Sequence, residues 1–250
     1  MFRKNLSKAA AVDVFRHKGW LARTPAAFRE EILRRCDVLH LRRGQSAYEM
    51  GDEPGGLYGV SSGRLDVHLP SRVDAPSLTW LAAPGFWTGD IAAVTGTRRQ
   101  ITLIAGADSR VLRLSRASMI QIVEADPQAW LHFAELLARN FATALSAIAL
   151  LRLDSPIARV CALLAGLAVD DTDPSPTVRA SQAEIAAMTQ LGKTAVNASL
   201  SELEAAGVIQ RRYASVRVLD IDRCRSLMPR ASEESGELEP RRSAVIGVAV

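Results

Sequence analysis

The sequence predicts an α+β fold in which a β-rich N-terminal half is followed by a long helix and a small C-terminal module of short helices and a β ribbon. Three observations lead to this prediction. Short apolar runs separated by turn residues fill 37–114, apolar residues recur at helical spacing over 126–153, and two short helical segments precede an alternating ribbon at 208–219. These sequence patterns divide the chain into a lead-in (1–22), a β-roll (23–125), a helix (126–154), a winged helix-turn-helix (155–228) and a tail expected to be disordered (229–250).

Composition and charge restrict the class of protein. The 250 residues are 48% apolar, which is enough for one or two packed domains. No continuous apolar run reaches the length of a membrane span and the N-terminus lacks the apolar core of a secretory signal, so a cytoplasmic location is expected. The net charge of +4 fits a nucleic-acid partner, but many soluble proteins are mildly basic.

Metal and catalytic signatures are not found in the sequence. Cys36, Cys161 and Cys224 are far apart and the four histidines are dispersed, so neither a disulfide, an iron–sulfur cluster nor another metal site is expected. No nucleophile–base pair, paired carboxylates or phosphate-binding loop points to an enzyme. We therefore expect a non-enzymatic protein without a cofactor.

The N-terminal third begins with a lead-in, helical or poorly ordered, and a short helix over 25–36. Thr24 is its expected N-cap, Pro25 its first turn, and Phe28, Ile32 and Leu33 its apolar face. Short strands separated by Gly, Pro, Asp and Ser clusters follow at 38–41, 57–60, 65–69, 78–81, 101–104 and 111–114. Evenly spaced short strands of this kind are typical of a small barrel or roll.

A seam of apolar residues runs along the predicted long helix with steps of four and three. Its members are Trp130, Ala134, Leu137, Phe141, Ala144, Ile148 and Leu151. Such a seam, about three heptads long, can pair two chains in a coiled coil. The alternative is a helix buried against its own domain, because Leu136, Leu145 and Leu150 widen the apolar face. Pro156 ends this helix and suits the first turn of the next.

The segment 181–204 has the pattern of a helix-turn-helix. Ser181 and Glu184 form a capping box, and Ile185 and Met188 are the expected core of the first helix. After a break at 189–192, a second helix from Lys193 buries Val196, Leu200 and Leu203. It ends at Gly207 in the left-handed region, directly before the ribbon.

The polar face of this module predicts DNA binding. In a winged helix-turn-helix the second helix lies in the major groove, and its outward residues Lys193, Thr194, Asn197 and Ala198 would reach base edges. The flanking arginines expected at phosphates are Arg179, Arg211, Arg212 and Arg217. The alternative, a helical hairpin with a solvated polar face, does not account for the capping box, ribbon and arginines together.

With these parts in this order, residues 25–228 resemble the cyclic-AMP receptor protein/FNR (Crp/Fnr) family of bacterial regulators. GQSAYEMGDEPGGLYGVSSGRLDV (44–67) is similar to the opening of the family's cyclic-nucleotide-binding β-roll, 126–153 to its dimerisation helix and 181–219 to its winged helix. The resemblance implies a jelly-roll topology, a homodimer, a two-fold DNA site and, for an activator, RNA polymerase as a further partner.

The family's effector pocket is altered in this chain. The Gly-Glu-Leu and Arg-Ser that bind ribose and phosphate in cyclic-AMP sensors correspond to Gly89-Asp90-Ile91 and Arg99-Gln100. The polar pair that reads adenine falls at the apolar residues Ala144 and Leu145. We therefore expect an effector other than cyclic AMP, with Arg99 as a surface or salt-bridged residue. A cyclic-nucleotide-responsive regulator remains the alternative.

Sequence features typical of other branches of the family and of other functions can also be compared with this chain. An FNR-type cluster needs several N-terminal cysteines, whereas only Cys36 lies there, and no haem ligand stands out. The family's usual base-reading residues are replaced here by Lys193, Thr194 and Ala198, and Gln190 stands where the turn often has Gly. The preferred operator should therefore differ from the best-known operator of the family. A nucleotide-sensing module that acts on a protein partner through the winged helix is the second hypothesis.

Overall fold

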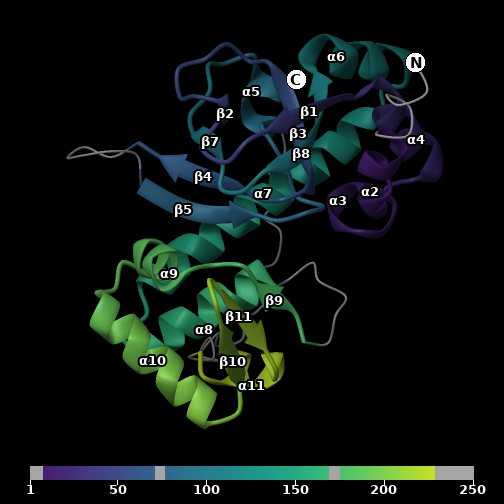
Figure 1. Ribbon diagram of the computed structural model, residues 1–250. Coiled ribbons are helices and arrows are strands. Elements are labelled where there is room, and N and C mark those ends of the chain that lie inside the picture. Colours follow the sequence, from purple (N-terminus) through teal and green to yellow (C-terminus); the bar gives the residue numbers. More distant parts are fainter. Residues whose placement is uncertain (1–7, 71–76, 169–174, 229–250) are drawn as a thin grey trace, which may run out of the picture.

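The computed structural model describes residues 8–70, 77–168 and 175–228. In Figure 1 the strands β1–β8 and the N-terminal helices form an upper part, and β9–β11 with α8–α11 form a lower part. The long helix α7 (Ala129–Leu151) runs beneath the strands toward the lower part. The predicted tail, 229–250, lies outside the described residues.

The described N-terminal helices are short and contribute large side chains to the core. They are α2 (Val14–His17), α3 (Gly19–Ala22) and α4 (Ala26–Arg35). Phe15, Trp20 and Leu21 are buried, so this part of the predicted lead-in is helical and packed. The prediction of Thr24 as N-cap is wrong, because Pro25 occupies that position and the Thr24 hydroxyl donates to the Leu21 carbonyl at 2.8 Å.

Two four-stranded antiparallel sheets form the roll, as the resemblance implied. One has the order β1-β8-β3-β6 and the other β2-β7-β4-β5. The strands are β1 (Asp37–Leu41), β2 (Ser46–Tyr48), β3 (Gly56–Ser62), β4 (Leu65–Leu69), β5 (Ser77–Ala82), β6 (Trp87–Thr88), β7 (Thr102–Ala105) and β8 (Ser109–Ser115). Buried residues from both sheets, including Val60, Leu65, Leu103 and Val111, pack between them. Every predicted strand is present.

Four short elements of the roll have no counterpart in the sequence prediction. The strands β2 and β6 are only three and two residues long, too short for a period of two to be recognised. The helix α5 (Asp90–Thr95) follows β6, and α6 (Arg116–Ala125) follows β8. Ser115 caps α6 by accepting a hydrogen bond from the Ser118 amide, a signal that the sequence does carry.

The lower part is a winged helix-turn-helix with one more strand than predicted. The helices are α8 (Pro156–Leu167), α9 (Gln182–Thr189), α10 (Lys193–Ala205) and α11 (Ile221–Ser226). The strands β10 (Ile209–Arg212) and β11 (Ser215–Val218) form the predicted ribbon, and β9 (Thr177–Val178) adds to its edge. Pro156 stands in the first turn of α8 as expected. The predicted core residues of α9 and α10 are buried.

The upper and lower parts share one apolar cluster. Trp80 and Leu81 of β5 pack with the core of the winged helix, which includes Leu164 and Ile185. A Cβ on Gly166 of α8 would lie only 2.8 Å from the Trp80 ring, so the indole rests directly on that helix. The roll therefore contacts the winged helix directly and is not joined to it by α7 alone.

Candidate functional site

The helix-turn-helix is built by reciprocal capping and a left-handed turn. The Ser181 hydroxyl accepts from the Glu184 amide at 3.3 Å, and the Glu184 carboxylate accepts from the Ser181 amide at 2.7 Å. This confirms the predicted capping box. Gln190 follows α9 with φ +54°, a conformation that non-glycine residues adopt uncommonly. The chain thereby reverses direction, and α10 begins two residues after Leu191.

One face of α10 is left open to solvent at its N-terminal end. Lys193, Thr194, Asn197 and Ala198 are exposed, whereas Val196 and Leu200 are buried on the opposite side. Residues at i, i+1, i+4 and i+5 lie on neighbouring faces of a helix, so these side chains form one surface. An ammonium, a hydroxyl and a carboxamide grouped this way can donate to and accept from the edges of base pairs.

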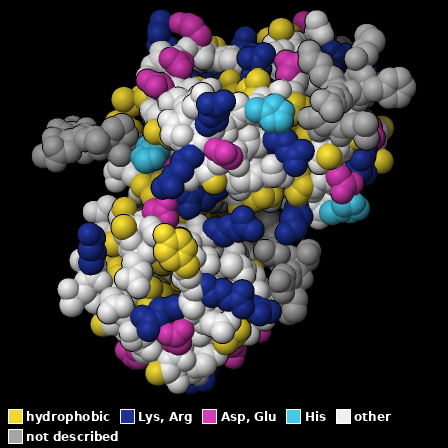
Figure 2. All heavy atoms as spheres, in the orientation of Figure 1, with side chains coloured by type: hydrophobic (Ala, Val, Ile, Leu, Met, Phe, Trp, Pro, Cys, Tyr) yellow, Lys and Arg dark blue, Asp and Glu magenta, His cyan; other side chains and the backbone are white. Residues whose placement is uncertain are grey.

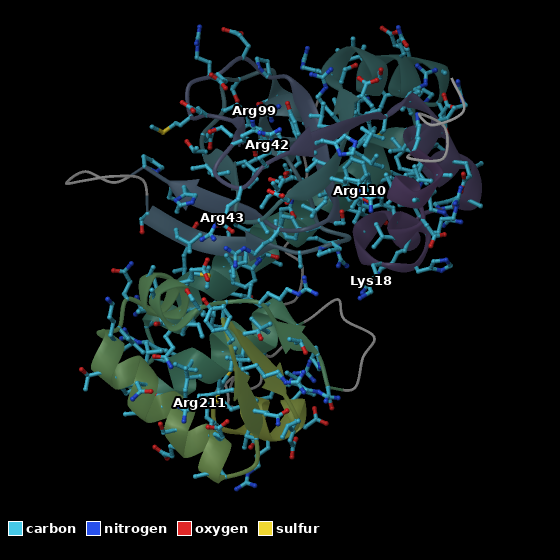
Figure 3. All side chains as sticks on the ribbon, viewed as in Figure 1. Lys18, Arg42, Arg43, Arg99, Arg110 and Arg211 are labelled. Carbon is cyan, nitrogen blue, oxygen red and sulfur yellow. The ribbon has the colours of Figure 1, made fainter. Side chains whose placement is uncertain are left out.

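Arg211 is held inside the module. Its Nε lies 2.6 Å from a Glu204 carboxylate oxygen, and its Nη1 donates to the Asn197 side-chain oxygen at 3.2 Å and to the Ser201 hydroxyl at 3.1 Å. Figure 3 shows Arg211 between the ribbon and α10. The structure thus places Arg211 where it orients Asn197, a role that the sequence argument missed.

The other predicted phosphate contacts lie around the ribbon. Arg212 is exposed on β10 and donates to the Gln210 side chain at 3.1 Å, and Arg179 is exposed after β9. Arg217 is half-buried, and its Nε donates to the Ser175 carbonyl at 3.4 Å. Arg179 and Arg212 therefore present charge to solvent, whereas Arg211 is neutralised by a carboxylate.

Two apolar stripes run along α7. Phe133, Leu136 and Leu150 face the protein's own core. Of the three leucines that favoured a helix buried against its own domain, Leu136 and Leu150 are therefore buried as that alternative requires, whereas Leu145 is 49% exposed. All seven residues of the predicted seam lie on an exposed stripe, with Phe141 64% and Ile148 58% accessible. By length and composition α7 could also cross a membrane, although the core helices of soluble proteins pass the same test. Contiguous exposed apolar surface of this kind is typical of interaction sites.

The residues of the altered effector pocket are brought together, but their contacts are with the protein itself. Asp90 is buried at the start of α5, and its carboxylate accepts from the Asn140 side chain of α7 at 2.7 Å. Burial raises the pKa of Asp90 above its usual value, although the Asn140 hydrogen bond opposes the rise. Gln100 is exposed. The sequence prediction did not include Asn140, although a polar residue at helical spacing within the buried stripe of α7 was a visible signal.

Arg99 corrects the sequence prediction. It was expected on the surface or in a salt bridge, yet it is 3% exposed and lies inside the roll (Figure 3). Its two terminal nitrogens donate to backbone carbonyls, that of Gly89 at 3.1 Å and that of Gly56 at 2.8 Å. The guanidinium also lies over the Tyr48 ring, 4.2 Å from its centroid. The hydrogen-bond donors that the family offers to a phosphate are here used by the protein backbone.

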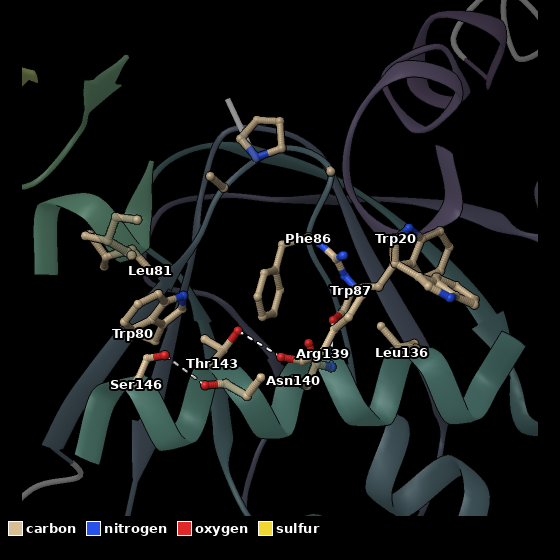
Figure 4. Close-up of a pocket in the computed structure, with 16 residues that line it drawn as sticks. Trp20, Trp80, Leu81, Phe86, Trp87, Leu136, Arg139, Asn140, Thr143 and Ser146 are labelled. Carbon is tan, nitrogen blue, oxygen red and sulfur yellow. Dashed lines mark hydrogen bonds between the residues drawn. The ribbon is translucent and has the colours of Figure 1, made fainter. Parts of the chain in front are cut away.

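Space for a small molecule exists outside the roll. A cavity of about 280 Å³ lies between the β5–β6 turn, α7 and α8. Figure 4 shows Trp80 at one end, Trp20 and Trp87 at the other, and Thr143 and Ser146 along the helix. The hydroxyls of Thr143 and Ser146 both donate to carbonyls of their own helix. The lining is mainly apolar and includes four aromatic side chains, which suits an apolar molecule better than a nucleotide.

The comparisons with known proteins agree with this architecture. Residues 38–126 match the family model described as the cyclic nucleotide-binding domain, and residues 158–227 match that described as the Crp-like helix-turn-helix domain. No curated protein matches the chain by sequence at a significant level.

The alignments with solved structures of similar fold cover nearly the whole length of those proteins. FixK2 from Bradyrhizobium japonicum has a TM-score of 0.70 at 16% identity, with 79% of this chain and 99% of that chain covered. The c-di-GMP responsive global regulator CLP from Xanthomonas campestris has a TM-score of 0.60 at 17% identity, with 78% and 99% covered.

TTHB099, described as a CRP-family transcriptional regulator from Thermus thermophilus, has a TM-score of 0.58 at 25% identity, with 75% of this chain and 95% of that chain covered. The two family models occupy the upper and lower parts of the structure in the order found in these regulators. The chain therefore belongs to the Crp/Fnr family of transcription regulators.

Proposed function

We propose that this protein acts as a cytoplasmic homodimer that reads a two-fold DNA operator and responds to an effector other than cyclic AMP. The observation that carries the proposal is the exposed surface of Lys193, Thr194 and Asn197 at the start of a recognition helix whose opposite face is buried. The N-terminal end of such a helix contacts base edges in the major groove. If the outcome is activation, RNA polymerase is the expected further partner.

A dimer is supported by the exposed stripe of α7. Seven residues at alternating steps of four and three are solvent-accessible, and a second copy of the same helix would cover them in a coiled-coil seam. The two-fold axis of such a pair would relate two recognition helices. Their half-sites on DNA would then be about one helical turn apart, so a palindromic operator is expected.

The contacts of Arg99 support an effector other than cyclic AMP. A phosphate at this position would have to replace two backbone carbonyls that the guanidinium already contacts. It would also bring its charge next to the buried Asp90. The cyclic-nucleotide-responsive alternative therefore requires the roll to rearrange around Arg99 before binding.

Selection of bound sequences from a random DNA pool tests the DNA proposal. The wild-type dimer should recover a palindrome, and Asn197→Ala should relax the preference at one base pair of each half-site by about 1–3 kcal/mol. Arg212→Ala should weaken binding to all sequences alike and reduce the salt slope by about one per half-site. These two signatures separate base reading from phosphate contact.

The control for this selection is Arg98→Ala, because Arg98 is an exposed residue of the roll paired with Glu53. It should leave both the recovered sequence and the affinity unchanged. Failure to recover any enriched sequence at low salt would contradict the proposal. If Lys193→Ala and Arg212→Ala left regulatory activity intact, the winged helix would instead be a protein-binding surface. Recovery of a palindrome only with cyclic AMP would favour the nucleotide-responsive alternative.

A further inference from the structure

The side chain of Arg211 is anchored on one face of α10. One Glu204 carboxylate oxygen accepts from the Arg211 amide at 2.8 Å, and the other accepts from its Nε at 2.6 Å. These hydrogen bonds, from the amide first and the guanidinium second, hold the pKa of Glu204 below its usual value. Asn197, Ser201 and Glu204 are spaced by four and three residues, so they share a helix face along which the guanidinium extends.

The contact with Arg211 fixes the orientation of the Asn197 carboxamide. A guanidinium has only N–H donors, so the Asn197 atom that it contacts at 3.2 Å must be the oxygen, Oδ1. The Nδ2 amino group therefore lies on the other side of the carboxamide, away from Arg211. Because Asn197 is exposed, this amino group is the free end that the side chain offers to a base.

The surroundings of this amino group are positively charged. Lys193 is exposed one turn before Asn197 on the same face of α10, and an ammonium group also has donors and no acceptor. Figure 2 shows basic side chains, with an acidic one beside them, at the surface of the lower part where Figure 3 labels Arg211. The recognition surface around Asn197 is therefore made chiefly of hydrogen-bond donors.

The purines differ in how well they match such a surface. In the major groove guanine presents two acceptors, N7 and O6, whereas adenine presents the acceptor N7 beside the N6 amino donor. To bind adenine through both of its polar atoms, Asn197 would have to accept from N6 with the same oxygen that already accepts from Arg211. The N6 amino group would then lie close to a guanidinium, which is electrostatically unfavourable.

We propose that Asn197 reads a guanine in each half-site and that Arg211, anchored by Glu204, is the positioning residue that sets this preference. The Nδ2 amino group donates to the N7 and O6 edge of the base, and Arg211 itself does not touch the base. The inference rests on the proposed function, because it requires α10 to lie in the major groove of DNA. The ribbon thus influences sequence preference through a residue that contacts the recognition helix.

Operator duplexes that differ at one base test the preference. The base pair to vary is the one at which Asn197→Ala relaxes the sequence selected by the wild type. Fluorescence polarisation should show that the wild type binds the guanine duplex about tenfold more tightly than the adenine duplex. A preference for adenine or thymine at this base pair would overturn the inference.

Replacement of that guanine by 7-deazaguanine, which lacks the N7 acceptor, gives a second measurement that changes only the DNA. It should weaken binding by the wild type severalfold and leave the affinity of Asn197→Ala unchanged. Equal affinity of the wild type for the guanine and 7-deazaguanine duplexes would overturn the contact.

Arg211→Met tests the positioning role. Without the guanidinium, the Asn197 oxygen can accept from adenine N6 while the amino group donates to N7, so the preference for guanine over adenine should fall by about tenfold. Glu204→Ala removes the anchor but leaves the guanidinium, and it should shift the preference in the same direction by a smaller factor. Equal loss of affinity for all four duplexes in both variants would overturn the positioning role.

The matched control is Arg223→Met, the same substitution at an exposed arginine whose Nη1 donates to the Ala206 carbonyl beyond the end of α10. It should keep the base preference of the wild type. An enriched palindrome with a base other than guanine at the position read by Asn197 would overturn this inference and leave the proposed DNA reading intact. Failure to enrich any sequence would overturn both.

Discussion

The guanidinium of Arg99 is enclosed by aromatic rings and backbone carbonyls inside the roll. Its donors join the Gly56 carbonyl at the start of β3 to the Gly89 carbonyl before α5, and Tyr48 supplies a ring face. Gly89 has φ +88°, and a Cβ there would lie 2.7 Å from an Arg99 nitrogen, so only glycine fits. The cation is therefore part of the roll's internal structure.

Arg99→Met should lower the free energy of unfolding by about 2–4 kcal/mol, because two buried carbonyls lose their donor and the methionine cannot replace it. Urea denaturation followed by tryptophan fluorescence measures the change. The neighbouring Arg98→Ala removes an exposed ion pair and should change stability by less than about 1 kcal/mol. If Arg99→Met instead left the free energy of unfolding unchanged or raised it, Arg99 would not stabilise the roll. Binding of an anionic ligand would then be the better explanation of this buried cation.

Among the helices and strands, α7 has a buried and an exposed apolar stripe, which lie on different faces of the helix. Phe133, Leu136 and Leu150 attach it to the roll and to α8, while Asn140 hydrogen-bonds Asp90 and the Trp87 carbonyl. The stripe that contains Phe141 and Ile148 remains accessible. A helix with apolar residues on both faces is expected to be covered on both, so the exposed stripe is the surface on which the proposed dimer would form.

If the proposed dimer forms through this stripe, Phe141→Glu should convert it to a monomer, because two copies would place carboxylates in the apolar seam. Burial of an unpaired charge costs several kcal/mol, which corresponds to at least about a hundredfold weaker association. Sedimentation equilibrium measures the dissociation constant. Met50→Glu, a change at an exposed apolar residue of the roll, is the control and should leave association unchanged. A Phe141→Glu protein that stayed dimeric would exclude this stripe as the interface.

At the scale of the whole molecule, Arg64 connects the roll to the helix-turn-helix. It pairs with Asp66 in β4 and with Glu184, the residue that also closes the capping box of α9. Burial raises the pKa of Asp66 despite its hydrogen bond from Arg64. Burial also opposes ionisation of Glu184, but hydrogen bonds from Arg64 and Ser181 outweigh it and hold the pKa of Glu184 below its usual value. The ionised Glu184 therefore stabilises this arrangement of the two parts.

Glu184→Gln should loosen the contact between roll and winged helix while preserving the cap, because glutamine also serves in a capping box. Because the folded-state pKa of Glu184 lies below the usual carboxyl pKa, the ionised Glu184 stabilises the contact at pH values above the usual carboxyl pKa. This stabilisation is lost as the pH falls through the lowered pKa of Glu184. The wild type should therefore lose the contact on acidification, whereas Glu184→Gln should lack it at neutral pH. Hydrogen exchange of the β3–β4 turn and of α9 measures both.

The control for this experiment is Ser181→Ala, which removes the N-cap hydroxyl and should lower stability by about 1 kcal/mol. It should leave protection of the β3–β4 turn unchanged, because the Arg64–Glu184 pair remains. Equal protection of that turn in the wild type and Glu184→Gln at neutral pH would show that Trp80 and its apolar neighbours hold the two parts together without the ion pair.

Most features that depend on neighbours in the chain were predicted correctly, although the N-cap at Thr24 was not. The capping box of Ser181 and Glu184, the buried stripe of α10 and the left-handed Gly207 all follow from spacings of three to seven residues. The strands with four or more alternating or apolar residues were found, and those with two or three were not. The separation of α7 into a buried and an exposed stripe was left open, because periodicity shows that a face is apolar but not what covers it.

The order of the parts, the helix-turn-helix and the departures of residues 89–100 from the family pattern could be read from the amino-acid sequence, since propensity, capping and residue identity are local properties. The packing of the sheets and helices was needed to show that Arg99 is buried on backbone carbonyls, that Arg211 orients Asn197 and that Arg64 reaches Glu184, 120 residues away. It also brought described segments as far apart in the chain as Lys18 and Arg212 to the walls of one hollow. Such contacts depend on how the sheets and helices pack, and a long polar side chain has many partners within reach until the packing selects one.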